Sequence, residues 1–93
     1  MAVYKITYSD LVVGGDIPRL DKAVAVRIKR VIMAKLTSAP DEFGKPLRRP
    51  YHGYWVLRMG NYRIVYSIFK NMVRITAILH RDRVYQELIR RLD

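Results

Sequence analysis

Three strand-like runs separated by short turn signals make up most of the second half of this chain. They are Tyr54–Arg58, Tyr62–Phe69 and Met72–Leu79. Each run is rich in β-branched and aromatic residues, as strands are. The dipeptides Gly60-Asn61 and Lys70-Asn71 lie between the runs, and Gly and Asn tolerate the positive φ angles of tight hairpin turns. Because such short connections join antiparallel neighbours, the pattern predicts a β-meander.

The N-terminal part predicts a strand followed by a weak helix. Val3–Tyr8 alternates and is rich in β-branched and aromatic residues, which favours a strand. The pair Ser9-Asp10 can cap a short helix, but Gly14-Gly15 disfavours helix, so this segment is also compatible with a loop. Asp16–Pro18 predicts a break, because a proline disfavours helical backbone at the residue before it.

A long amphipathic helix is expected next, capped by Asp21 and ending near Thr37. Apolar residues recur along it at a spacing of four. They are Val24, Ile28, Ile32 and Leu36. The opposite side is basic, and such a run is more often a solvated helix surface than a nucleic-acid contact.

The remaining segments complete an α+β domain. Ser38–Pro50 predicts a loop, because it contains prolines and a glycine and few apolar residues. Val84–Leu92 has apolar residues at helical spacing and predicts a final helix. The order β-α-α-β-β-β-α indicates a single domain over residues 1–93, with the helices packed on one face of an antiparallel sheet and the N-terminal strand. The other face would then be free to bind a partner.

The composition points to a polyanionic partner. Lys and Arg number 18 against 8 Asp and Glu, so the net charge is +10 and the pI is about 10.3. So large an imbalance indicates nucleic acid, the ribosome or an acidic protein as partner. The absence of cysteine excludes a disulfide scaffold, a thiol nucleophile and a zinc–cysteine site. With two histidines and dispersed carboxylates we expect no metal and no cofactor. No long apolar run occupies the N-terminus, so we expect neither a signal peptide nor a membrane span, and a cytoplasmic protein.

Two arginines are expected near each other on the meander. Strand alternation places Arg63 on the same face as Val65, and Arg58 on the same face as Val56. A two-residue turn would bring Arg58 close to Arg63, although the sequence leaves the turn length, and hence the pairing, open. Two nearby arginines repel unless an anion lies between them, and phosphate matches the guanidinium fork.

More polar side chains follow the last strand, where functional loops are common. Arg81 and Arg83 are followed by Tyr85, which can stack on an unpaired base, move a proton, or simply pack the last helix on the sheet. His80 is another proton carrier, although a lone histidine is more often structural. RNA supplies its own nucleophile, the ribose 2′-OH, so arginines that neutralise the phosphorane and one group that moves protons would suffice for cleavage without metal.

Several motifs together resemble the RelE/ParE toxin superfamily, in particular its RelE-like branch. The segment Leu57–Arg63 reads Leu-Arg-Met-Gly-Asn-Tyr-Arg, where such toxins typically have Leu-Arg-Val-Gly-Asp-Tyr-Arg. His80–Tyr85 follows the pattern His-Arg-x-x-Val-Tyr. Asp16–Leu20 and Phe43–Arg48 extend the resemblance over almost the whole chain. It implies the toxin of a type II toxin–antitoxin system, an mRNA interferase that cleaves mRNA in the ribosomal A site without a metal and thereby inhibits translation.

The resemblance also implies roles and partners. Arg63 and Arg81 would bind phosphate and stabilise the transition state, and Tyr85 would stack on the base or transfer a proton. Further RNA- or phosphate-binding positions would be Arg58, Lys45, Arg48, Arg49, Arg83 and His80. The partners would be a cognate acidic antitoxin, in an assembly such as a heterotetramer, and mRNA on the 70S ribosome, with no membrane. The chain departs from some members by lacking lysines on the strand Tyr54–Leu57, where Trp55 stands in place of a basic residue.

Two other functions remain open at the level of sequence. One is a ParE-like toxin that inhibits DNA gyrase by protein–protein contact, although that branch generally lacks the constellation of Arg81 and Tyr85. The other is a catalytically degenerate toxin that only binds its antitoxin or nucleic acid, which the missing strand lysines favour. A shared fold does not decide among the three.

Overall fold

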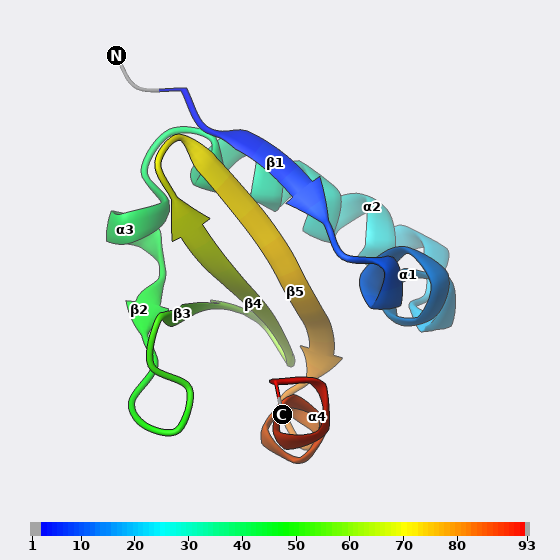
Figure 1. Cartoon of the computed structure of the whole chain (residues 1–93). Coiled ribbons are helices and arrows are strands. Elements are labelled where there is room, and N and C mark those ends of the chain that lie inside the picture. Colours follow the sequence, from blue (N-terminus) through cyan, green and yellow to red (C-terminus); the bar gives the residue numbers. More distant parts are fainter. Residues whose placement is uncertain (1–2, 93) are drawn as a thin grey trace.

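One five-stranded sheet organises the computed structural model, which describes residues 3–92 (Figure 1). The strands are β1 (Lys5–Tyr8), β2 (Lys45–Pro46), β3 (Tyr54–Met59), β4 (Tyr62–Phe69) and β5 (Met72–His80). Their order is β1-β5-β4-β3-β2, and each neighbouring pair is antiparallel except β1 with β5. The predicted α+β fold with a meander is confirmed. Gly60 and Lys70 adopt positive φ angles of 57° and 55° in the two turns, as tight hairpins require.

Helical segments connect and flank the strands. They are the π-helical turns η1 (Val12–Asp16) and η2 (Ile32–Leu36), and the α-helices α1 (Ile17–Arg19), α2 (Lys22–Val31), α3 (Pro40–Phe43) and α4 (Val84–Leu92). The predicted final helix is confirmed as α4. Within residues 3–92, no helix has the length and apolar character needed to cross a bilayer.

The predicted long helix is confirmed as α2 continuing into η2. Ile28, Ile32 and Leu36 are fully buried, as their spacing of four predicts. Asp21 stands at the N-cap position, but its carboxylate makes no capping hydrogen bond. Its backbone carbonyl instead accepts a hydrogen bond from the N–H of Ala25 at 2.9 Å. The helix therefore begins where expected without the expected cap.

The predicted break at Asp16–Pro18 was wrong. Gly14 and Gly15 lie in the π-helical turn η1, and the chain remains helical through α1. Pro18 is the second residue of α1 and lies one residue before the last residue of this helix, Arg19. The helix ends only at Leu20, whose ψ angle of 148° is extended.

The segment predicted as a featureless loop contains two short elements, α3 and β2. Tyr66 anchors them, because its fully buried hydroxyl donates a hydrogen bond of 2.6 Å to the carbonyl of Pro40. Burial, with a smaller contribution from the charge of Asp41, raises the pKa of Tyr66 to about 12. A Cβ at position 44 would overlap the Tyr66 hydroxyl, so Gly44 is required for this close approach. Local sequence patterns did not reveal this because the anchor comes from a distant strand.

Helices cover both faces of the sheet, so the prediction of helices on one face was wrong. On one face, α2 and η2 pack on residues that include Ile64 and Tyr66 of β4. On the other face, Val84 and Leu88 of α4 pack on Val65 and Ala77. Since α4 buries one apolar stripe, it needs a sheet face of its own.

A bulge in β5 changes which side chains face which core. Val65 pairs with Ala77 and Tyr66 pairs with Ile75, so Thr76 has no partner in the ladder. As a result Ile75 and Ile78, three residues apart, both face the α2 side. An extra residue in one strand shifts the alternation that follows, and His80 therefore follows Ile78 onto the α2 side.

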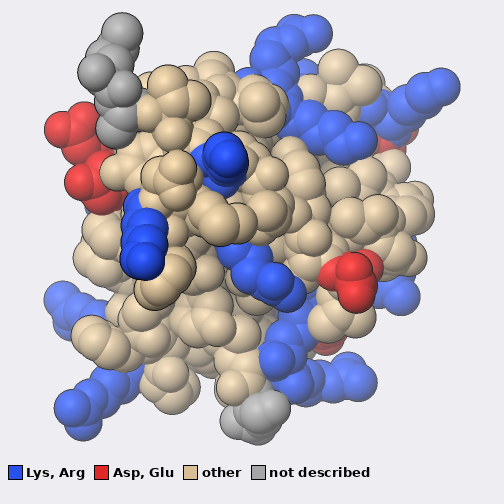
Figure 2. Space-filling view, turned by 45° about the horizontal axis from the view of Figure 1, so that its top comes forward, with Lys and Arg blue, Asp and Glu red and all other residues tan. Residues whose placement is uncertain are grey.

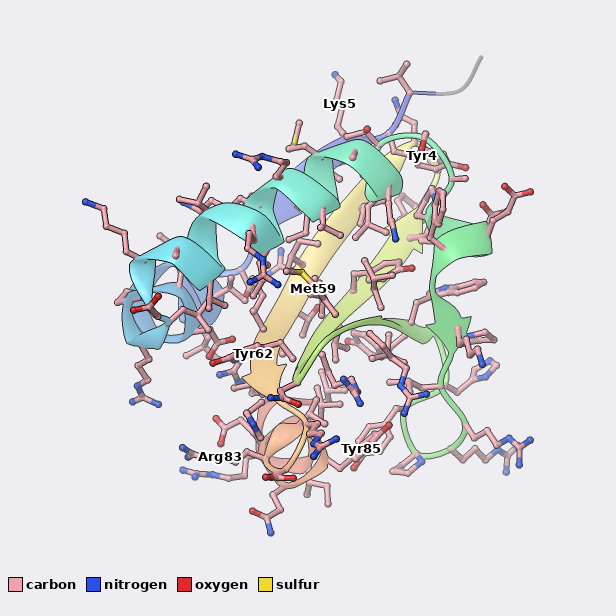
Figure 3. The ribbon with its side chains drawn as sticks, turned by 180° about the vertical axis from the view of Figure 1, so that it is seen from behind. Tyr4, Lys5, Met59, Tyr62, Arg83 and Tyr85 are labelled. Carbon is pink, nitrogen blue, oxygen red and sulfur yellow. The ribbon has the colours of Figure 1, made fainter. Side chains whose placement is uncertain are left out.

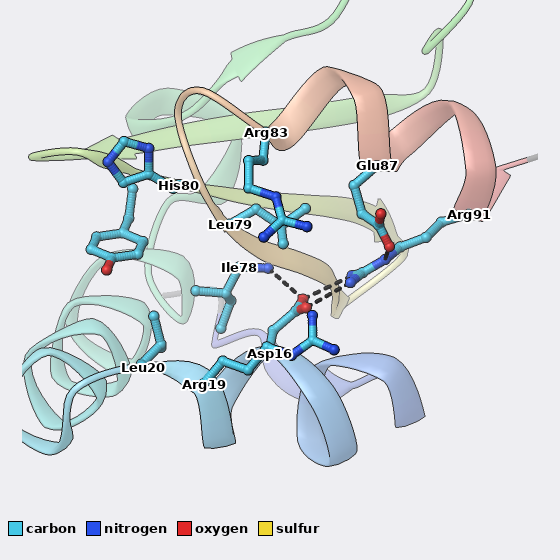
Figure 4. Close-up of a pocket in the computed structure, with 10 residues that line it drawn as sticks. Asp16, Arg19, Leu20, Ile78, Leu79, His80, Arg83, Glu87 and Arg91 are labelled. Atoms are coloured by element: carbon cyan, nitrogen blue, oxygen red, sulfur yellow. Dashed lines mark hydrogen bonds and ion pairs between the residues drawn. The ribbon is translucent and has the colours of Figure 1, made fainter.

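A buried ion pair fixes α4 to the rest of the fold (Figure 4). The Asp16 carboxylate accepts hydrogen bonds from Arg91 at 2.6 and 2.8 Å and from the N–H of Ile78 at 2.9 Å. The Arg91 guanidinium also donates to the Thr76 carbonyl and to Glu87. The hydrogen bond with Asp16 raises the pKa of Arg91 above its ordinary value. This cluster ties η1 and β5 to the last turn of α4.

Candidate functional site

An open groove lies where the β3–β4 hairpin meets the segment after β5, and its volume is about 470 Å³. Its polar lining consists of Lys45, Arg58, Arg63, Arg81, Asp82 and Tyr85. Leu47 and Val56 add an apolar part. Four basic side chains thus share the groove with one carboxylate, which makes it a site for an anion.

Arg58 and Arg63 are direct cross-strand partners, which decides the pairing that the sequence left open. Both lie on the α4 side of the sheet, because the side chains that alternate with Arg63 in β4 pack in the α2 core. The Arg63 guanidinium donates hydrogen bonds to the carbonyls of Gly60 at 3.0 Å and Tyr62 at 2.9 Å. Like charges directly opposite in a sheet repel, so an anion in the groove would relieve the strain of this pair.

The chain after β5 is tied to the hairpin turn. The backbone N–H of Arg81 donates to the carbonyl of Asn61 at 2.7 Å. This bond brings Arg81 to the same groove as Arg63, although 17 residues separate them in the sequence. The Arg81 side chain is exposed, and its Nε lies 3.9 Å from Asp82 Oδ1. At that distance and exposure the ion pair is weak, so Arg81 is available to a phosphate.

Tyr85 presents a half-exposed ring to the groove. Tyr85 lies in the first turn of α4 and is 50% exposed to solvent. The neighbouring buried residues Val84 and Leu88 pack the helix on the sheet, so Tyr85 is not needed for that packing. In Figure 3, Tyr85 projects from the start of α4 toward the loop that precedes β3. The ring is therefore accessible for stacking.

Tyr51, in the loop that precedes β3, contacts Tyr85 through its hydroxyl and its ring. Its hydroxyl donates to the backbone carbonyl of Tyr85 at 3.3 Å, and the two ring centroids lie 6.0 Å apart at 36°. Sequence reasoning missed Tyr51. An aromatic residue two positions after the basic pair Arg48-Arg49 was the available signal, because aromatic residues interleaved with basic ones are typical of nucleic-acid surfaces.

The structure leaves four of the predicted binding residues outside the groove. Arg48 and Arg49 are exposed in the loop before β3 and do not line it. His80 lies on the opposite side of the sheet, where its ring meets Tyr62 edge to face at 5.7 Å. Arg83 lies on the other side of the α4 start from Tyr85 (Figure 3). For His80 the reason is the bulge at Thr76, which no local pattern predicts.

Charge alone does not locate the site. Figure 2 shows Lys and Arg spread over the visible face, with Asp and Glu at only a few points. Among residues 3–92, no three His, Asp or Glu side chains are grouped so as to hold a metal ion. What distinguishes the groove is that opposed arginines, a third arginine from the segment after β5 and an accessible tyrosine converge there.

The fold and the groove define a class of protein: small, basic α+β domains with an arginine-lined groove at one end of a meander. Residues 14–85 match the family model described as "ParE toxin of type II toxin-antitoxin system, parDE". Since this match covers well over half of the chain, the chain belongs to the ParE toxin family of type II toxin–antitoxin systems, within the RelE/ParE superfamily. The predicted superfamily is thereby confirmed.

Individual relatives agree with this assignment. Toxin RelE of Mycobacterium tuberculosis is 33% identical over 63 residues, which cover 68% of this chain and 65%, just under two thirds, of that relative's length. The RelBE2 toxin–antitoxin complex from Mycobacterium tuberculosis contains a chain that matches with a TM-score of 0.81 and 28% identity, over 87% of this chain and 94% of that one. The isolated E. coli RelE toxin matches with a TM-score of 0.67 at 21% identity, over 97% and 99% of the two chains, and supports the fold alone.

Proposed function

We propose that this toxin is a metal-independent endoribonuclease that cleaves mRNA in the ribosomal A site and so inhibits translation in the cytoplasm. The observation that carries the proposal is the convergence of Arg58, Arg63, Arg81 and Tyr85 on one open groove. A gyrase inhibitor that acts by surface contact has no need of three arginines and a tyrosine around one groove. The similarity to Toxin RelE supports the same activity.

Each groove residue has a role in this reaction. The ribose 2′-OH attacks the adjacent phosphorus, the 5′-oxygen leaves, and a 2′,3′-cyclic phosphate results. Arg63 and Arg81 would hold the phosphate and stabilise the charge that develops on its oxygens. Tyr85 would stack on the base beside the scissile bond and so orient the 2′-OH for in-line attack, or pass a proton through its hydroxyl. Arg58 and Lys45 would bind neighbouring phosphates.

The partner of this toxin would be an acidic antitoxin. The similar RelBE2 structure is a toxin–antitoxin complex, and a charge of +10 is strongly attracted to an acidic segment. A bound antitoxin would neutralise part of this charge and block entry to the ribosome. Two toxins and two antitoxins in a heterotetramer are consistent with this arrangement.

The decisive experiment is mRNA cleavage on programmed ribosomes. Arg81→Ala should abolish A-site cleavage, and Tyr85→Phe separates the hydroxyl from the ring because it retains stacking and loses proton transfer. Arg30→Ala is the matched control, since Arg30 is an exposed arginine of α2 on the opposite face of the sheet. Intact mRNA with the unmodified toxin would refute the proposal, and cleavage that survives Arg81→Ala would refute the site.

A second function deserves the parallel assay, because the matching family model is that of ParE. If the toxin leaves mRNA intact and instead blocks supercoiling by DNA gyrase, the groove is not its functional site. If it does neither and still binds an antitoxin, it is a degenerate toxin.

A further inference from the structure

A second basic pocket lies on the other side of the β5–α4 connection from the groove. It has a volume of about 170 Å³ and is enclosed by α1, the end of β5 and α4. Figure 4 shows Arg19 reaching into it from α1 and Arg83 from the connection, on opposite sides of the cavity. The sequence predicted Arg83 as an RNA- or phosphate-binding residue, and it did not single out Arg19.

The inner charges of this pocket are already satisfied. Asp16 is neutralised by Arg91, and Glu87 pairs with Arg91 and Arg90. Arg19 and Arg83 are different, because neither forms an ion pair with any carboxylate in the described part of the chain. Two unpaired guanidiniums that line one cavity repel each other. A tetrahedral oxyanion between them would remove this repulsion and accept hydrogen bonds from both forks.

The rim of the pocket adds a feature that suits a nucleotide. Tyr62 and His80 line it, with their rings edge to face at 5.7 Å. Aromatic rings beside arginines are typical of surfaces that bind single-stranded nucleic acid, where bases or riboses lie against the rings. A carboxylate of an acidic peptide would form ion pairs with the two arginines but would make no contact that needs the rings of Tyr62 and His80.

The pocket also continues the path of the groove. Arg81 lines the groove and Arg83 lines the pocket, although only one residue separates them. Two residues of chain span at most about 7 Å. An RNA strand that crosses the β5–α4 connection would therefore meet one basic site on each side of this connection.

We propose that Arg19 and Arg83 form a second phosphate-binding site, which holds the RNA strand beyond the part bound in the groove. This inference rests on the proposed ribonuclease function. The site binds RNA and takes no part in bond cleavage.

The test measures affinity without cleavage. The probe is a short single-stranded RNA with methylated 2′-hydroxyls, which lacks the nucleophile, and its binding is followed over a range of salt concentrations. Arg19→Gln and Arg83→Gln should each weaken binding about two- to fivefold at low salt. Each should also reduce the salt slope by about 0.7, the contribution of one phosphate contact of a single strand. Arg90→Gln is the matched control, because Arg90 is 80% exposed on α4 and lies outside the pocket.

The outcomes separate this inference from the proposed function. If both variants bind the methylated RNA like Arg90→Gln while the unmodified toxin cleaves mRNA, the second site is refuted and the ribonuclease stands. If the unmodified toxin does not bind the methylated RNA at all, the second site is refuted, and the ribonuclease function is judged separately by cleavage on programmed ribosomes. If the variants lose affinity only for an acidic oligo-glutamate peptide, the pocket serves a protein partner and the RNA assignment is overturned. Thermal unfolding equal to that of the control would show that the losses are not due to misfolding.

Discussion

Replacing Arg91 by methionine should strongly destabilise the protein and release α4. The Asp16 carboxylate is 1% exposed and accepts two of its three hydrogen bonds from Arg91. Arg91→Met would leave a buried carboxylate with the N–H of Ile78 as its remaining donor. Removing one partner of a buried ion pair costs about 3–5 kcal/mol, against a total stability of about 5–15 kcal/mol for a domain.

The assay is unfolding by urea and by heat, each followed by the fluorescence of Trp55 and by circular dichroism. For a domain of this size, about 3–5 kcal/mol corresponds to a fall in melting temperature of roughly 12–40 °C. Arg90→Met on the exposed side of α4 is the control and should change stability by no more than about 0.5 kcal/mol.

A double variant tests the physical cause. Asp16→Asn combined with Arg91→Met removes the buried charge that either single change leaves behind, so its cost should be smaller than the sum of the two. If Arg91→Met stays within about 1 kcal/mol of the Arg90→Met control, the ion pair does not hold α4 and the reasoning fails.

Three further predictions follow from other contacts. Gly44→Ala should destabilise the fold by about 1–3 kcal/mol, because the new Cβ overlaps the Tyr66 hydroxyl; a melting temperature equal to that of the parent would contradict it. The pKa of Tyr66 is about 10 in the unfolded state and about 12 in the folded state. The contribution of its hydroxyl to the free energy of unfolding is therefore intact below pH 10, and it falls by about 3 kcal/mol as the pH rises through 12. The stability difference between the parent and Tyr66→Phe should therefore shrink in this range and remain constant from pH 6 to about 9. Tyr51→Phe, which loses only the hydrogen bond to Tyr85, should reduce cleavage on ribosomes less than Tyr51→Ala, which also removes the ring; equal losses would exclude ring contact as the support of Tyr85.

Local patterns predicted most elements of the fold. The strand runs and final helix lie within a residue or two of their predicted bounds, because alternation and helical spacing are local properties. The failures lie where distant contacts decide. The segment Asp16–Pro18 is helical, and the buried Asp16 carboxylate accepts hydrogen bonds from Arg91 and from the N–H of Ile78. The short helix α3 forms beside the Tyr66 hydroxyl, which donates to the carbonyl of Pro40.

The candidate site divides in the same way. Arg58, Arg63, Arg81 and Tyr85 were selected by residue type and position, and the structure brings all four to one groove. Residue type did not predict that His80 lies on the other side, that Arg83 belongs to a separate pocket, or that Tyr51 supports Tyr85.

The sequence by itself determined the class of fold, the strongly basic charge and the superfamily, because periodicity, composition and motif order are local properties of the chain. Only the tertiary structure decided which arginines oppose each other, which face carries α4 and where a second pocket opens. These depend on the register of β3 with β4, on the bulge at Thr76 and on the pairing of Asp16 with Arg91. Each of these three features depends on contacts made in the folded chain, and no short-range sequence pattern predicts them. They form only when the sheet and the helices pack together.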